Sequence, residues 1–152
     1  MTADQPRLRY REEGNVHLDF HGAAATTINF IVARFGTEAL HDIFRHVARD
    51  VYQDLRAHLL AGDSGEVVRH WQHFFTREGA DFDIAVGEDE IVMTVRHCPA
   101  WHHVARIHGA VPERFCDQTS VVNTELAEGT PFAIDTVLTG PGACRQIIRR
   151  RT

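Results

Sequence analysis

The sequence predicts an α+β domain, with an N-terminal helical layer followed by a β-β-α-α-β-β succession whose hairpins join in an antiparallel sheet. Two observations lead to this class. Up to residue 79 apolar residues recur at helical spacing, and from residue 81 they alternate with polar ones, as in half-buried strands. The 152 residues are enough for one hydrophobic core. We divide them into an N-terminal arm, residues 1–17, and a single α+β domain, residues 18–152.

Three helices are expected in the first half of the chain. The first begins at Asp19, because apolar residues then recur three and four positions apart, and Gly36 ends it. Thr37 is the expected N-cap of the second, which runs without interruption over 38–60 behind one apolar stripe. The third follows a turn at 62–65 and ends at Gly79.

Strands and helices then succeed one another. Alternating apolar residues predict strands over 82–86 and 91–95, joined by a polar turn. A second hairpin is expected over 132–138 and 144–149, around the sequence Thr-Gly-Pro-Gly. Between the hairpins, Pro99 suits the first turn of a helix whose N-cap is Cys98, and residues 112–128 are expected to form another helix.

Composition narrows the range of partners. A formal net charge of -5 and a pI near 6.1 argue against a general nucleic-acid binder, which needs a basic face. No stretch approaches the ~20 apolar residues of a membrane span, and the first residues lack the apolar segment of a secretory signal. We therefore expect a cytoplasmic protein with a small-molecule substrate and with neither nucleic acid nor a membrane as partner. The oligomeric state stays open, a homodimer included.

Cys98 is the first candidate for chemistry. A thiol at a helix N-terminus lies near the positive end of the helix dipole, which favours thiolate and lowers the pKa. His102, four residues along, falls on the same helical face as a base or co-ligand. His103 is the alternate base, and His97 is expected to point elsewhere. A half-buried cysteine among surface histidines is the competing interpretation.

The helix over 112–128 carries a polar face that suits a small ligand. Its members, spaced at i, i+3, i+4 and i+7, are Cys116, Thr119, Ser120 and Asn123. Asp117 lies beside this face and Glu128 at the helix end, and either carboxylate could orient a histidine or hold a substrate ammonium. Capping and solvation explain both carboxylates equally well.

The three cysteines could also meet at one metal ion. Cys98, Cys116 and Cys144 with a histidine such as His21 make a tetrahedral Cys3His set, for which zinc is the first choice and iron the second. The cysteines lack the short Cys-x-x-Cys spacing of a strong metal signature. His21 has two further interpretations, as a proton shuttle and as an exposed or capping histidine. Wide spacing and an odd number also suit free thiols in a reducing compartment.

Several short runs together resemble a known family. In the second half they are Cys98-Pro99 after a strand, Phe115-Cys116 followed by Asp117 and Thr119, the helix end over 126–129, and Cys144 in the last hairpin. Phe20-His21 and Phe35-Gly36 give a looser match in the first half. On these residues the chain resembles the L-2-amino-thiazoline-4-carboxylic acid hydrolase family. The resemblance implies hydrolytic opening of a small sulfur- and nitrogen-containing ring, with a product of the N-carbamoyl cysteine type.

Residues and resemblance together predict a hydrolase or lyase acting on a C-N or C-S bond of a small heterocyclic or amidine-like substrate. The predicted catalytic residues are Cys98, His102, His103, Cys116 and Asp117, and the predicted substrate contacts are Thr119, Asn123 and Glu128. A thiolate or a metal-bound hydroxide could attack the ring carbon. The order of elements is also similar to four-vinyl-reductase domains, which implies the alternative of a small-ligand- or metal-binding sensor module without catalysis.

Overall fold

The computed structural model describes residues 17–152, so the predicted N-terminal arm lies outside the described residues except for His17. Four helices come first along the chain, α1 (Asp19–Phe35), α2 (Thr37–Asp50), α3 (Gln53–Leu60) and α4 (Gly65–Glu78). They are followed by β1 (Asp81–Val86), β2 (Glu90–His97), α5 (Pro99–His108), α6 (Asp117–Ala127), β3 (Phe132–Gly140) and β4 (Ala143–Arg150). The predicted α+β class and its β-β-α-α-β-β succession are confirmed.

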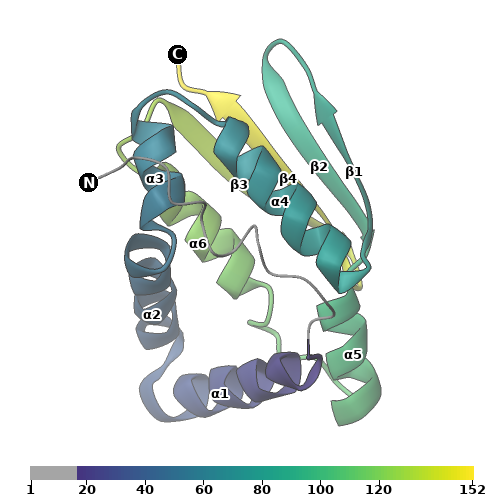
Figure 1. Cartoon of the computed structure of the whole chain (residues 1–152). Coiled ribbons are helices and arrows are strands. Elements are labelled where there is room, and N and C mark those ends of the chain that lie inside the picture. Colours follow the sequence, from purple (N-terminus) through teal and green to yellow (C-terminus); the bar gives the residue numbers. More distant parts are fainter. Residues whose placement is uncertain (1–16) are drawn as a thin grey trace, which may run out of the picture.

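The four strands form one antiparallel sheet in the order β1-β2-β4-β3. β4, the last strand in the sequence, is therefore inserted between β2 and β3, and Cys144 pairs with Val95 on one side and with Leu138 on the other. Because side chains alternate along a strand, Met93, Val95 and Ile148 share one face of the sheet. These residues form the main core with α3, α4 and α6, and Figure 1 shows α4 lying over the sheet.

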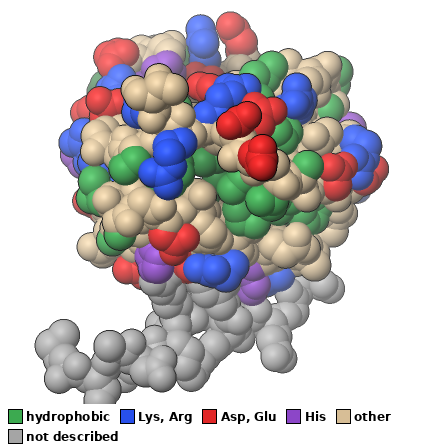
Figure 2. Space-filling model, turned by 90° about the horizontal axis from the view of Figure 1, so that it is seen from above, with side chains coloured by type: hydrophobic (Ala, Val, Ile, Leu, Met, Phe, Trp, Pro, Cys, Tyr) green, Lys and Arg blue, Asp and Glu red, His purple; other side chains and the backbone are tan. Residues whose placement is uncertain are grey.

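The opposite face of the sheet carries ion pairs between neighbouring strands. Arg96 on β2 donates to Asp81 on β1, with 2.7 Å between Nη2 and Oδ1. Arg149 on β4 binds Glu90 at 2.9 Å and Asp135 at 3.1 Å. Basic and acidic side chains also lie interspersed on the face of the molecule shown in Figure 2. The sheet is thus apolar towards the helices and charged on the other side.

A second core cluster joins α1 to α2 and α5. Ala25 and Ile28 of α1 are buried against Leu40 of α2 and against Ala100 and Val104 of α5. In Figure 1, α1 runs along the lower edge of the molecule, between α2 and α5 and away from the sheet. The N-terminal helix is therefore held by its two neighbouring helices. No helix within residues 17–152 has the length and the apolar sequence that would be needed to cross a membrane.

The uninterrupted helix expected over 38–60 is wrong, because the chain breaks between α2 and α3 at Val51 and Tyr52. Val51, which the apolar stripe placed in the core, is 65% exposed, whereas Leu55 in the next turn is 1% exposed. The break turns Tyr52 towards the inside of the molecule, where it packs against the main core. The break is stabilised by the burial of Tyr52 and Leu55, which the helical spacing of the apolar residues does not indicate.

Two helix starts also differ from expectation. The second helix is capped by Gly36, which has φ 86°, and Thr37 is already its first helical residue. The helix expected over 112–128 begins only at Asp117, after a turn that ends at the N-cap Cys116. By contrast, Cys98 is the N-cap of α5 with Pro99 in its first turn, as predicted.

Candidate functional site

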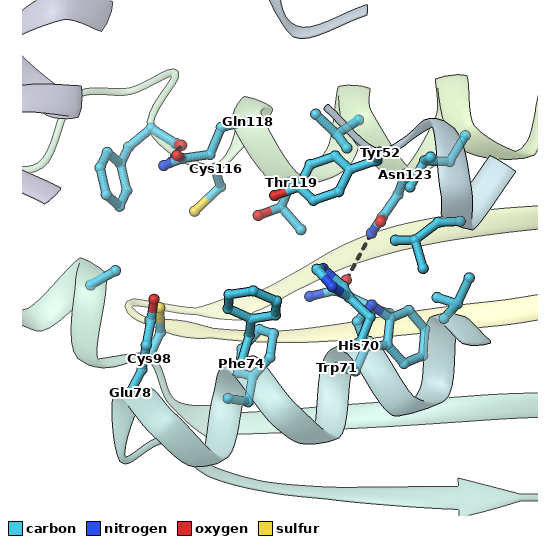
Figure 3. A pocket seen from close by; sticks show the side chains of 18 of the residues that line it. Tyr52, His70, Trp71, Phe74, Glu78, Cys98, Cys116, Gln118, Thr119 and Asn123 are labelled. Atoms are coloured by element: carbon cyan, nitrogen blue, oxygen red, sulfur yellow. Dashed lines mark hydrogen bonds between the residues drawn. The ribbon is translucent and has the colours of Figure 1, made fainter. Parts of the chain in front are cut away.

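A cavity of about 260 Å³ lies between α4 and α6, and Figure 3 shows the two helices on its opposite sides. Its remaining walls come from the start of α5, from Tyr52 and Leu55 at α3, from His21 on α1 and from Gln146 on β4. Small-molecule sites usually measure ~300–1,000 Å³. The cavity is therefore suited to a compact ligand.

The wall formed by α4 is mostly aromatic and ends in a carboxylate. Trp71, Phe74, Phe75 and Glu78 recur at i, i+3, i+4 and i+7, so they share one face of the helix, and all line the cavity. Glu78 was not among the predicted site residues, because an aromatic stripe at helical spacing is typical of ordinary packing. The signal was present, because a carboxylate at the i+7 position of an aromatic stripe is placed where a buried residue is expected.

The wall formed by α6 is the polar face that the sequence predicted. Cys116, Thr119 and Asn123 all line the cavity. Asn123 is only 5% exposed, and its Nδ2 donates to Oε1 of Gln146 at 2.7 Å and to Oγ1 of Thr136 at 3.0 Å. These bonds fix the amide against the sheet. Contact of Thr119 or Asn123 with a substrate stays a prediction.

An imidazole and a carboxyl group meet at one end of the cavity. Nε2 of His21 lies 3.6 Å from Oε1 of Glu78, and the two side chains are 16% and 22% exposed. Burial raises the pKa of Glu78, against the smaller effect of Arg77. Burial, and next to it the charge of His103, lowers the pKa of His21. At neutral pH His21 is therefore an uncharged base, and its Nε2 is buried without a hydrogen bond to any described residue.

Cys98 enters the same end of the cavity from the start of α5. Its backbone N–H donates to the carbonyl of Gly142 at 2.8 Å, which ties the helix to the turn between β3 and β4. Burial raises the pKa of the Cys98 thiol, and the charge of Glu78 raises it further. Backbone N–H groups of Trp101 and Ala100 act in the opposite direction but are outweighed. The predicted lowering of this pKa by the helix N-terminus is therefore wrong, because desolvation dominates.

The other two thiols lie close enough to Cys98 to interact with it. Burial raises the pKa of Cys116 to about 11, and the charges of Cys98, Cys144 and Asp117 add to this. Burial likewise raises the pKa of Cys144 to about 11, despite a hydrogen bond with Gln146. Figure 3 shows Cys116 and Cys98 on opposite sides of the cavity, whereas Cys144 does not line it. All three thiols are free, and at neutral pH all three are protonated.

The predicted metal set is not preassembled. Within residues 17–152, no three His, Cys, Asp or Glu side chains are arranged so that they could hold a metal ion. Binding of zinc or iron by Cys98, Cys116, Cys144 and His21 therefore stays a prediction. Thiols with raised pKa values also resist the deprotonation that metal binding requires. We derive no chemical step through a metal.

The structure does not bring the two predicted bases to the cavity wall. His102 stacks on His97, with ring centroids 4.0 Å apart and an angle of 3° between the rings, and neither histidine lines the cavity. His103 is 8% exposed and faces α1. Its Nδ1 lies 3.2 Å from Nη2 of Arg106, and its Nε2 lies 4.0 Å from Oδ1 of Asp19. The histidine at this end of the cavity is His21, where His102 or His103 was predicted.

Asp117 and Glu128 also lie outside the cavity wall. Asp117 bonds Nε2 of His41 at 2.6 Å, which connects α6 to α2. Glu128 is exposed at the end of α6, where its backbone carbonyl accepts from Nη1 of Arg56 at 2.6 Å. Neither residue lines the cavity, so the catalytic role predicted for Asp117 and the substrate contact predicted for Glu128 stay predictions without support from the cavity.

No protein-family model matches the chain, and no curated protein matches it either.

Proposed function

We propose that the protein is a hydrolase of small heterocyclic or amidine-like compounds, acting on a C-N or C-S bond inside the cavity between α4 and α6. One observation carries the proposal. The His21–Glu78 pair, 3.6 Å apart, lines the same cavity as Cys98, and the charge of Glu78 acts on that thiol. A nucleophile, a neutral base and an orienting carboxylate are the components of nucleophilic catalysis.

The proposed reaction uses these groups in two stages. The sulfur of Cys98 attacks the electrophilic ring carbon, and the thiol proton passes to Nε2 of His21, since a thiol with a raised pKa needs a base in the same step. Glu78 stabilises the imidazolium, and the leaving nitrogen or sulfur takes the proton as the ring bond breaks. Water then adds to the carbon with His21 again as base, and the protonated thiol departs.

The walls of the cavity suit such a substrate. Aromatic side chains of Trp71 and Phe74 offer flat faces to a small ring, and the thiols and His21 gather at one end. The resemblance to L-2-amino-thiazoline-4-carboxylic acid hydrolases, on Cys98-Pro99, Phe115-Cys116 and the Phe20-His21 start, supports the same substrate class. Free thiols in a reducing environment support the cytoplasm as the compartment in which the protein works.

A binding module without catalysis, similar to four-vinyl-reductase domains, is the second candidate. It is favoured by the raised pKa of Cys98, Cys116 and Cys144, because a protonated thiol is a weak nucleophile. In that case the aromatic wall and the amide of Asn123 hold a small ligand that is not transformed. A copurified ligand, released unchanged on denaturation, would favour this function over hydrolysis.

Turnover of a panel of small cyclic amidines and thiazolines by wild type, Cys98→Ser and His21→Asn tests the proposal. Loss of ~10²-fold or more in kcat/KM in both variants is expected, because each removes a group that acts on the reacting atoms. Cys144→Ser is the matched control, since Cys144 is a buried thiol that does not line the cavity. Equal losses in Cys98→Ser and Cys144→Ser would point to a three-thiol centre and against a single nucleophile.

A further inference from the structure

One face of α1 carries an exposed stripe of small and apolar residues. Its members recur four and three positions apart, which places them on one side of the helix, and all are exposed: Asp19, Ala23, Thr26, Phe30 and Ala33. We call this set the α1 stripe. The other side of the helix is buried against α2 and α5 through Ala25 and Ile28. In Figure 1 no helix or strand of residues 17–152 lies below α1, on the side away from the rest of the molecule.

Exposure of this stripe is unusual for a surface helix. Phe30, in its centre, is 55% exposed. Thr27 beside the stripe adds little polarity, because its hydroxyl already donates to the carbonyl of Ala23 at 2.9 Å. A surface helix normally shows charged residues on its outer face, and a contiguous apolar strip marks a contact.

The charges of α1 indicate what covers the stripe. Apart from its histidine, the helix has two charged residues, Asp19 in the first turn and Arg34 in the last, and both are exposed. An antiparallel pair of such helices brings each negative end to a positive end, and it also opposes the two helix dipoles. The stripe is therefore complementary to a second copy of itself.

The sizes of the side chains and the positions of the two charges both favour the same antiparallel register of the two α1 helices. When Phe30 lies opposite Ala23 of the second copy, Asp19 lies opposite its Arg34, and the two-fold axis falls between Thr26 and Thr27. Each phenyl ring then meets a small side chain, and small residues at the axis let the two backbones approach. We propose that the protein forms a homodimer through antiparallel self-pairing of the α1 stripe. Such an isologous contact closes on itself and buries both copies of the stripe.

The dimer bears on the cavity without depending on the proposed reaction. His21 projects from the inner side of the same helix and lines the cavity. A partner helix on the outer side presses α1 against α2 and α5, so the dimer holds His21 beside Glu78. Self-pairing of α1 is independent of whether the cavity catalyses a reaction or only binds a ligand.

Sedimentation velocity of the full chain, from ~1 to ~100 µM, measures the dimerisation directly. Phe30→Glu is expected to raise the dimer Kd at least about tenfold, because it places a charge at the centre of the contact. Leu60→Glu is the matched control, since Leu60 is 53% exposed on α3, outside the stripe, and its replacement leaves the Kd unchanged. A wild-type monomer over the whole range would overturn the proposal.

Reversal of the two charges tests the register. Asp19→Arg and Arg34→Asp each place like charges opposite one another, so each is expected to weaken the dimer about threefold or more at low salt. The double variant D19R/R34D restores opposite charges at both ends and returns the Kd to within about twofold of wild type. A dimer that survives Phe30→Glu, or a double variant weaker than both single ones, would exclude antiparallel self-pairing.

Discussion

Oε1 of Glu78 lies 3.6 Å from Nε2 of His21, although the two residues belong to α4 and α1, helices that are far apart in the sequence. Burial disfavours the charged form of both side chains, because it raises the pKa of Glu78 and lowers the pKa of His21. Pairs of titratable groups displaced in this way are typical of functional sites.

Glu78→Gln should make the protein more stable and less active. Burial holds the pKa of Glu78 above its unfolded value of 4.5, so the folded state binds the proton more tightly, and stability falls as the pH rises through the folded pKa. The neutral amide removes this penalty at pH 7, with an expected rise in Tm of ~2–4 °C, the change that about 1 kcal/mol produces in a chain of this size. Thermal melts at pH 4 and pH 7 measure it.

The gain should be smaller at pH 4, where the carboxyl of the wild type is more fully protonated. A purely structural Glu78 would instead give a variant that melts earlier at both pH values. Loss of turnover together with higher stability would be the pattern expected of a residue kept for function.

Alkylation of the cysteines should be slow at neutral pH and accelerate only in alkaline solution. The pKa of Cys116 and that of Cys144 are raised to about 11, and that of Cys98 is raised as well. Peptide mass spectrometry after timed iodoacetamide treatment, from pH 7 to pH 10.5, measures each thiol separately against the urea-unfolded chain. Faster reaction of Cys98 in the folded than in the unfolded chain at pH 7 would contradict the burial effect.

The same shifts make the fold sensitive to alkali. Between the unfolded value of 9.0 and the folded value of about 11, the native state binds more protons at Cys116 and Cys144 than the unfolded state does. Stability should therefore fall as the pH rises through this window. Urea midpoints at pH 8 and pH 10.5 check this, and a Cys116→Ser/Cys144→Ser variant should lose part of the difference.

Gly142→Ala should destabilise the protein by ~1–3 kcal/mol. Gly142 has φ 65°, and an added methyl carbon would lie 2.5 Å from Nε2 of His102. Gly62→Ala is a matched control, because Gly62 has φ 82° but nothing within 4 Å of the added carbon. Urea unfolding should show the larger loss in Gly142→Ala, and His102→Ala should recover the part due to the clash. Equal losses at both glycines would mean that only the backbone conformation matters.

Leu55→Ala should cost ~2–5 kcal/mol, whereas Val51→Ala should change stability by less than ~0.5 kcal/mol. Both positions belong to the apolar stripe that the sequence shows, but Leu55 is 1% exposed and Val51 is 65% exposed. Denaturant unfolding of the two variants therefore locates the break between α2 and α3. A large loss of stability in Val51→Ala would mean that Val51 is buried, as the continuous helix over 38–60 predicts.

Local patterns were enough to predict the strands, the hairpin turns and the start of α5. Alternation of apolar residues over 82–86 and 91–95, together with Pro99 after Cys98, acts within a few neighbouring residues, and the structure follows it. The break at Val51 and Tyr52 could not be predicted in this way, because neither residue is a helix breaker. It depends on the burial of Tyr52 against elements far away in the sequence.

The residues of the candidate site also divide into those that local patterns predict and those whose role depends on the folded chain. The polar face with Cys116, Thr119 and Asn123 follows from helical spacing alone. The partner of His21 does not, because Glu78 belongs to another helix and meets His21 only in the folded chain. Desolvation, which reverses the expected pKa change of Cys98, is likewise a property of the assembled core and not of the helix that the cysteine caps.

The strand order β1-β2-β4-β3 also governs how the chain can fold during its synthesis. β4 is the last strand to leave the ribosome, yet it lies between β2 and β3 and supplies Gln146 to the cavity wall. Until it arrives, β2 is paired with β1 alone and β3 has no strand partner among residues 17–152, so each exposes a row of unpaired backbone groups. The nascent chain therefore carries open sheet edges, which favour pairing with other chains, and closure of the sheet waits for residues 143–150.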